Sequence, residues 1–113
     1  MANTFLNAKS DLTTTNLTTV YTVPSATTAV IKSILVSEDA GSGTTIDVTL
    51  VDASGTIFSL FKAKAVGSNT TVELLTQPLI LEESEALKAQ AGDANELHVV
   101  ASILEVKPRQ VVT

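Results

Sequence analysis

The segment NLTTVYTVPSATTAVIKSILVSED (residues 16–39) decides the fold class. Thr, Val and Ile dominate it, and these β-branched side chains suit a pleated, half-buried strand better than a helix. Pro24 and Ser25 divide the segment into two extended stretches, because proline lacks the amide that a continuous ladder needs. We therefore expect a β-hairpin here and a chain built mainly from sheet.

The same pattern of strand-like segments and turn residues continues along the chain. Gly, Ser, Asn, Asp and Pro cluster at intervals of about 10 to 15 residues, which is typical of an all-β domain. The segment LEESEALKAQAGD (81–93) contains good helix formers, but its alternation favours an acidic turn at 82–85 followed by a strand. The expected strands are 4–10, 17–23, 28–38, 45–52, 56–65, 70–75, 79–82, 86–91 and 97–106. We predict one all-β domain over residues 1–113, an antiparallel, jelly-roll-like β-sandwich of eight to nine strands with little or no helix.

Size and composition fit one folded domain that meets other proteins. At 113 residues the chain can bury a core without a disulfide or a metal, and it contains no cysteine. Only 17% of the residues are charged, so contact with neighbouring protein requires little ionic desolvation. The net charge of −5 and the scattered basic residues argue against nucleic acid as a partner. No segment resembles a membrane span or a secretory signal, so we expect neither a membrane partner nor export.

Three expected strands are apolar on both faces, those containing residues 29–36, 56–61 and 97–106. In the second of them, simple alternation places Phe58 and Phe61 on opposite faces. A strand in a solvated monomer needs only one packed face. We therefore expect subunit contacts to cover the additional apolar faces; the alternative is that the two sheets curl over one another.

The sequence offers little for catalysis. His98 is the one histidine, and it has no nucleophile signature such as Gly-x-Ser-x-Gly beside it, so we expect a packed or surface residue. The acidic cluster at 82–85 lacks the loop pattern of a calcium site and fits a solvated turn. GSGTTI (41–46) and GSNTTV (67–72) lack the lysine of a phosphate loop and fit hairpin turns. We expect no enzymatic activity, no cofactor and no metal.

The order of these features over residues 1–106 resembles a group of small bacteriophage virion proteins. TTVYTVPSATTAVIKSILVSED (18–39) is similar to the hallmark hairpin of that group: Thr-x-Val-Tyr-Thr-x-Pro, a small polar turn and a long apolar strand. LILEESEALKAQAGDANELHVVASILEV (79–106) resembles its closing pattern of acidic turn, alternating strand, small-residue turn and final strand. The turn at 82–85 departs from the group, which more often has Glu-x-Gly-Asp there.

The resemblance implies a non-enzymatic structural protein of the virion, made in the host cytoplasm. Such proteins serve as capsid decoration or cement proteins, or in the neck and tail, often as symmetric oligomers. The expected partners are copies of this chain, in a trimer or another symmetric homo-oligomer, and the major capsid protein or neighbouring virion proteins.

Both ends of the chain are candidate arms for these contacts, at residues 1–8 and 107–113. The alternative functions are a neck, tail or fibre-base protein, a carbohydrate-binding sandwich, which the scarcity of aromatic residues disfavours, and a small hydrolase using His98. The interface candidates are Phe5, Leu6, Val30, Ile34, Phe58, Phe61, Lys107, Pro108 and Arg109.

Overall fold

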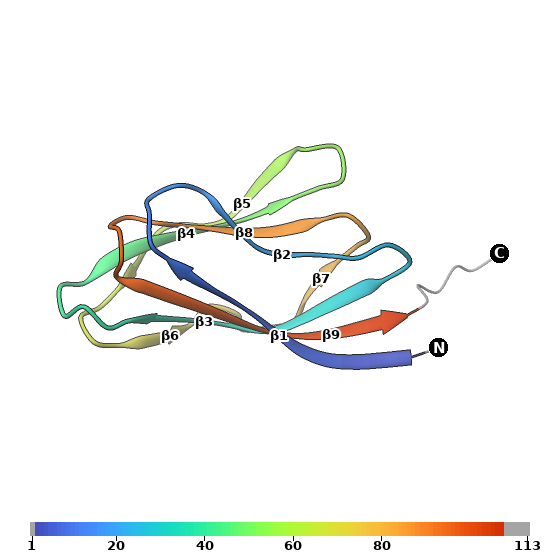
Figure 1. The fold of residues 1–113 in the computed structure, drawn as a ribbon, viewed down its shortest axis with the longest axis horizontal. Coiled ribbons are helices and arrows are strands. Elements are labelled where there is room, and N and C mark those ends of the chain that lie inside the picture. Colours follow the sequence, from blue (N-terminus) through green and yellow to red (C-terminus); the bar gives the residue numbers. More distant parts are fainter. Residues whose placement is uncertain (1, 108–113) are drawn as a thin grey trace.

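The computed structural model describes residues 2–107 and shows a β-sandwich of two antiparallel sheets (Figure 1). Within that range there is no helix, and so none that could cross a bilayer. The predicted all-β sandwich is confirmed, as is the strand at 86–91 in place of a helix. The strands are β1 (Ala2–Leu12), β2 (Thr18–Thr22), β3 (Thr28–Glu38), β4 (Thr44–Val51), β5 (Ile57–Val66), β6 (Thr71–Glu73), β7 (Leu79–Leu81), β8 (Ala86–Ala91) and β9 (Leu97–Lys107).

The connectivity is that of a jelly roll. Sheet A has the strand order β1-β9-β3-β6, with β7 also paired to β3, and sheet B has the order β2-β8-β4-β5. Since β6 and β7 both run antiparallel to β3 at different levels, they form one interrupted edge strand. Among consecutive strands, only β4 and β5 share a ladder. Most connections therefore cross from one sheet to the other.

The hairpins predicted from the sequence are wrong for this reason. β2 lies in sheet B beside β8, whereas β3 lies in sheet A beside β9, so the turn at Pro24 crosses between the layers. The expected hairpin turns at 41–46 and 67–72 likewise connect β3 to β4 and β5 to β6, across the sandwich. Turn residues mark where a strand ends, but the packing of whole sheets decides which strand becomes its neighbour.

The core lies between the two sheets and is formed by small and branched aliphatic side chains. Because strand residues alternate between faces, each strand contributes every second residue to this layer. The fully buried members of largest volume include Leu12, Ile31, Ile34, Ile46, Leu81, Leu87, Leu97 and Ile103.

A β-bulge resets the alternation of β3. The register with β9 shifts between Ile31 and Ser33, which leaves Lys32 as an additional residue. As a result Ile31 and Ile34 both face the core, and each is 0% exposed. The prediction of Ile34 as an interface residue is therefore wrong, because this side chain is sealed inside the subunit.

Two register shifts in the ladder between β4 and β5 likewise interrupt the alternation of β5. Phe58 is paired with Leu50 and Phe61 with Val48, so both rings lie on the core side of sheet B rather than on opposite faces as simple alternation suggests. In the part of β5 opposite Asp47, Ala63 adopts a φ of 51°. Its N–H donates to Asp47 Oδ1 over 2.6 Å, which holds the bulged backbone in place.

The N-terminal segment is part of the sheet. β1 pairs with β9 along its whole length, with Phe5 opposite Leu104 and Leu6 opposite Ile103. The described residues of the expected N-terminal arm, 2–8, therefore form an edge strand instead of a free arm. Of the expected C-terminal arm only Lys107 lies within the described residues.

Tyr21 and Glu105 connect the two sheets. The Tyr21 hydroxyl donates to Glu105 Oε2 over 2.5 Å, and Lys107 Nζ lies 3.2 Å from Glu105 Oε1. Burial, and then the adjacent Glu105 carboxylate, raise the pKa of Tyr21.

We expect Tyr21→Phe to lower the free energy of unfolding by about 2 kcal/mol, because a buried carboxylate loses a donor while the ring stays in place. Urea denaturation of the two proteins measures this difference. Thr22→Ala, at the adjacent exposed position, is the control and should change the stability little. A Tyr21→Phe protein as stable as wild type would show that the bond between the sheets contributes nothing.

Candidate functional site

The outer face of sheet A carries a row of apolar side chains across its width. Phe5 is paired with Leu104, Leu104 with Val30, and Val30 with Ile80. Paired residues of neighbouring strands lie on the same face, so these four residues form a continuous row, here called the outer row. Phe5 is 74% exposed at one edge and Ile80 is 53% exposed at the other, while Leu104 and Val30 are half-buried between them.

A second apolar pair lies further along the same face. Val100 is paired with Leu35, which is 39% exposed. At this level Lys9 stands on the edge strand β1 and Glu73 on the opposite edge strand β6. This level of the face therefore has an apolar centre with one charge of each sign at its two edges.

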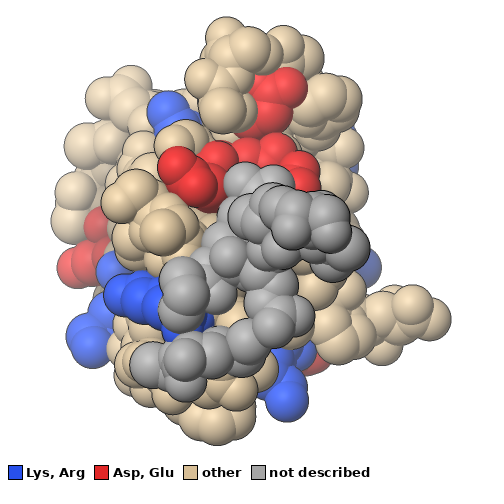
Figure 2. Space-filling model, turned by 90° about the vertical axis from the view of Figure 1, so that its right-hand side faces the viewer, with Lys and Arg blue, Asp and Glu red and all other residues tan. Residues whose placement is uncertain are grey.

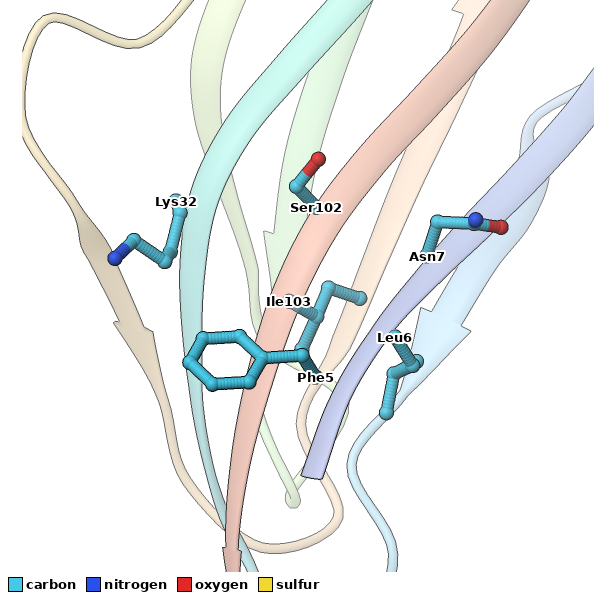
Figure 3. A pocket seen from close by; sticks show the side chains of 6 residues that line it. All are labelled: Phe5, Leu6, Asn7, Lys32, Ser102 and Ile103. Carbon is cyan, nitrogen blue, oxygen red and sulfur yellow. The ribbon is translucent and has the colours of Figure 1, made fainter. Parts of the chain in front are cut away.

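A shallow hollow of about 330 Å³ lies beside the outer row (Figure 3). The ring of Phe5 reaches from β1 across β9, and Lys32 stands on the far side of the hollow, on β3. Asn7 and Ser102 supply its other polar side chains. Across residues 2–107, no three metal-ligating side chains come together in a possible metal site.

The outer face of sheet B is polar by comparison. Asp47 is paired with Gln90, and Thr49 with Lys88, on its two central strands. The exposed apolar residues of this sheet lie instead on β5, near the tip of the β4–β5 hairpin, where Ile57, Phe58 and Leu60 are 59%, 50% and 36% exposed. An apolar outer face is thus a property of sheet A.

Acidic side chains gather at the end of the sandwich where β1 begins and β9 ends (Figure 2). The turn at 82–85 lies at this end, and the Glu85 carboxylate accepts the N–H of Glu82 over 2.8 Å. Asp52 shapes the neighbouring loop by accepting the N–H groups of Ser54 and Thr56. These carboxylates organise turns.

The predicted interface residues other than Ile34 fall into five groups. Phe5 and Val30 lie in the outer row, and Phe58 lies on the β4–β5 hairpin. Leu6 and Phe61 are half-buried against the core, and Lys107 pairs with Glu105, while Pro108 and Arg109 lie outside the described residues. Sequence reasoning missed other exposed or half-buried apolar residues on the outer face of sheet A, because only the strand register reveals their common face; among them are Leu35, Ile80, Val100 and Leu104.

His98 is a surface residue, as expected, and it is not arranged for catalysis. Its Nε2 lies 3.4 Å from Asp11 Oδ1 and its Nδ1 lies 3.6 Å from Asp39 Oδ2. Ser37 is its cross-strand partner, but both ring nitrogens face carboxylates. Neither nitrogen is therefore placed to take a proton from Ser37, as a serine nucleophile requires.

The Glu38 side chain holds together the two glycine-containing loops that were compared with phosphate loops, at 41–46 and 67–72. Its buried carboxylate accepts the N–H groups of Asn69 (2.9 Å), Gly41 (3.1 Å), Ser42 (3.3 Å) and Gly43 (3.3 Å). These hydrogen bonds, that from Asn69 first, lower the pKa of Glu38 to about 2 although burial opposes the charge. The loop amides thus hold an anion that belongs to the chain itself, which makes this a structural feature.

The sequence matches no protein-family profile and no curated protein, but solved structures share its architecture. A chain from the capsid of Helicobacter pylori bacteriophage KHP30 superposes with a TM-score of 0.56 over 95% of this chain and 94% of its own, at 13% identity. The chain shares its fold with chains of viral capsids. The likeness to small all-β virion proteins expected from the sequence is therefore confirmed for the fold.

Two further structures show how widely this fold is used. A protein of Bacillus endospore appendages, described as disulfide-linked pili, has a TM-score of 0.55 over 92% of this chain and 85% of its own, at 8% identity. A chain of infectious bursal disease virus, Gx strain, has a TM-score of 0.50 over 91% of this chain and 32% of its own, at 12% identity. At such identities the likeness concerns the fold alone.

Proposed function

We propose that this chain is a non-enzymatic structural protein of a bacteriophage virion, specifically a capsid decoration or cement protein that joins copies of itself and binds the capsid shell. The observation that carries the proposal is the outer row, an apolar strip across one face of a sandwich that has the fold of a phage capsid chain. Apolar side chains that cross a whole sheet are typical of a surface that another protein covers.

The proposed mechanism is adhesion. Covering the apolar face removes its surface from water at roughly 25 cal/mol per Å², before the costs of association are subtracted. The chain has no cysteine, so no disulfide joins its copies, unlike the disulfide-linked pili whose fold it shares. A low charge density keeps the desolvation cost of such contacts small.

The location on the particle is the first thing to test. We expect mass spectrometry of purified particles to find this chain in a fixed ratio to the major capsid protein, and electron cryomicroscopy to place it on the shell. A location at the neck, tail or fibre base would replace decoration by the alternative virion role. Absence from purified particles would contradict both.

Carbohydrate binding is a second candidate, and the hollow beside Phe5 is the observation that favours it. An exposed ring flanked by Asn7, Ser102 and Lys32 offers a stacking surface and hydrogen-bonding groups to a sugar. A glycan array with the purified protein, and with Phe5→Ala as the control, tests it. Reproducible binding that depends on Phe5 would favour this function over adhesion.

A further inference from the structure

We infer that two copies of the chain pack face to face through the outer faces of their sheets A, about a two-fold axis parallel to the strands between β9 and β3. The inference rests on the proposed function and deepens it, because it names both the surface and its occupant, a second copy. Three properties of the face carry it: size, the match of apolar groups under the rotation, and the match of charges.

The face has the size of a stable protein interface. β1, β3 and β9 have 11 residues each, which gives a length of about 36 Å at about 3.3 Å per residue. Three strand positions of this length at a spacing of about 4.8 Å, with the three residues each of β6 and β7 at the fourth position, give an area of about 600 Å². This is about three quarters of the roughly 800 Å² per partner that standard interfaces bury.

The two-fold rotation places apolar side chains of one sheet A opposite apolar side chains of the other. It exchanges β9 with β3, and β1 with the edge formed by β6 and β7, while each level of the sheet stays opposite itself. Phe5 of one copy then meets Ile80 of the other, and Leu104 meets Val30. At the second level Val100 meets Leu35 in the same way. Sheets packed like this lie about 10 Å apart, with side chains filling the space between them.

The same rotation pairs opposite charges. Lys9 and Glu73 stand at the two edges of one level, so Lys9 of each copy meets Glu73 of the other. Within its own subunit the Glu73 carboxylate also accepts the Ser33 hydroxyl and the N–H groups of Ile34 and Leu75. At the level between the two apolar ones Ser102 is paired with Ser33, and the exposed Lys32 of the bulge stands beside them. Such complementarity fixes one orientation and disfavours others. A shell protein could cover an apolar face too, but self-complementarity under one two-fold axis is what an isologous contact requires.

The oligomeric state gives the first test. Light scattering on the purified protein should give twice the 11.8 kDa of one chain. Ile80→Asp should raise the dissociation constant at least about 100-fold, because it puts an unpaired charge into the contact. Ile57→Asp is the matched control, with the same substitution at a similar exposure, 59% against 53%, but on sheet B. It should change the dissociation constant less than about 3-fold.

A monomer at every concentration, a trimer, or equal weakening by both substitutions would overturn the inference. Circular dichroism of the two variants separates weakened association from misfolding. If a variant misfolds, the cross-linking experiment below decides on its own.

Cross-linking tests the orientation in a chain that has no cysteine of its own. The rotation places Phe5 of one copy opposite Ile80 of the other and keeps the two Phe5 side chains apart. A mixture of the Phe5→Cys and Ile80→Cys proteins should therefore be joined by a thiol-reactive linker of about 10 Å, the spacing of packed sheets. Neither protein alone should be joined. Linking of Phe5→Cys to itself would show a different axis and overturn the inference.

The two proposals fail separately. Dimers of this geometry that are absent from particles would refute the virion role and leave the contact standing. A chain found on particles but monomeric and not cross-linked would refute the contact and leave the virion role standing.

Discussion

Replacing Ile34 with alanine is expected to lower the free energy of unfolding by about 3 kcal/mol, within the range of about 2 to 5 kcal/mol found for such truncations in protein cores. Ile34 is 0% exposed, on the inner face of sheet A. The substitution removes apolar contacts and leaves a cavity, because a sheet held by ladders on both sides closes only partly around the missing atoms. Urea denaturation followed by circular dichroism measures the change.

Ile57→Ala is the control for this experiment. Ile57 is 59% exposed on the outer side of β5, so truncating it should cost well under about 1 kcal/mol. Comparable losses at both positions would mean that Ile34 is not in a closed core. The comparison also avoids the outer row, so dimer formation does not affect the difference.

The positions of the strands could be predicted because each is encoded locally. Alternation and turn residues locate every strand to within two residues at each end, with β1 the largest departure: Ala2–Leu12 against the expected 4–10. The acidic turn before β8 was likewise visible in a short window, where alternation outweighed helix propensity. Local patterns of this kind do not depend on which strand lies next door.

Pairing and face could not be predicted, because they depend on residues far apart in the sequence. β3 reads as an apolar strand on both faces, and the additional residue at Lys32 becomes visible only when β9 lies alongside. Without that bulge, Val30 and Ile34 would lie on one face; with it, Val30 stays outside and Ile34 is buried. Of the two interface residues predicted on this strand, Val30 therefore lies on the outer face and Ile34 does not, because the bulge at Lys32 stands between them.

Only two of the four residues of the outer row were predicted from the sequence, because the other two join the row through strand pairing. Phe5 was predicted as part of the expected N-terminal arm, and Val30 as part of a strand that is apolar on both faces. Leu104 and Ile80 join them only through the register, which brings four strands to one level. A surface assembled from distant strands has no signature within any one of them.

Glu38→Gln is expected to lower the melting temperature at neutral pH and to remove most of the acid sensitivity that Glu38 confers. The folded protein lowers the pKa of Glu38 from its ordinary 4.5 to about 2, chiefly through the backbone amides of Asn69, Gly41 and Ser42. A carboxyl group with a lowered pKa stabilises the fold fully above its unfolded value, and this contribution disappears as the pH falls through the folded value. Glutamine has the same shape but no charge for the amides to bind.

The two melting curves should therefore converge between about pH 4.5 and pH 2, because protonated Glu38 resembles glutamine. Circular dichroism melts of both proteins from pH 7 downward measure this. Asp52 and Glu73 also have lowered pKa values, so their stabilisation of the fold decreases in acid. This decrease is the same in both proteins. The difference between the curves isolates Glu38, and a constant gap down to pH 2 would show that the loops hold the side chain by shape and not by its charge.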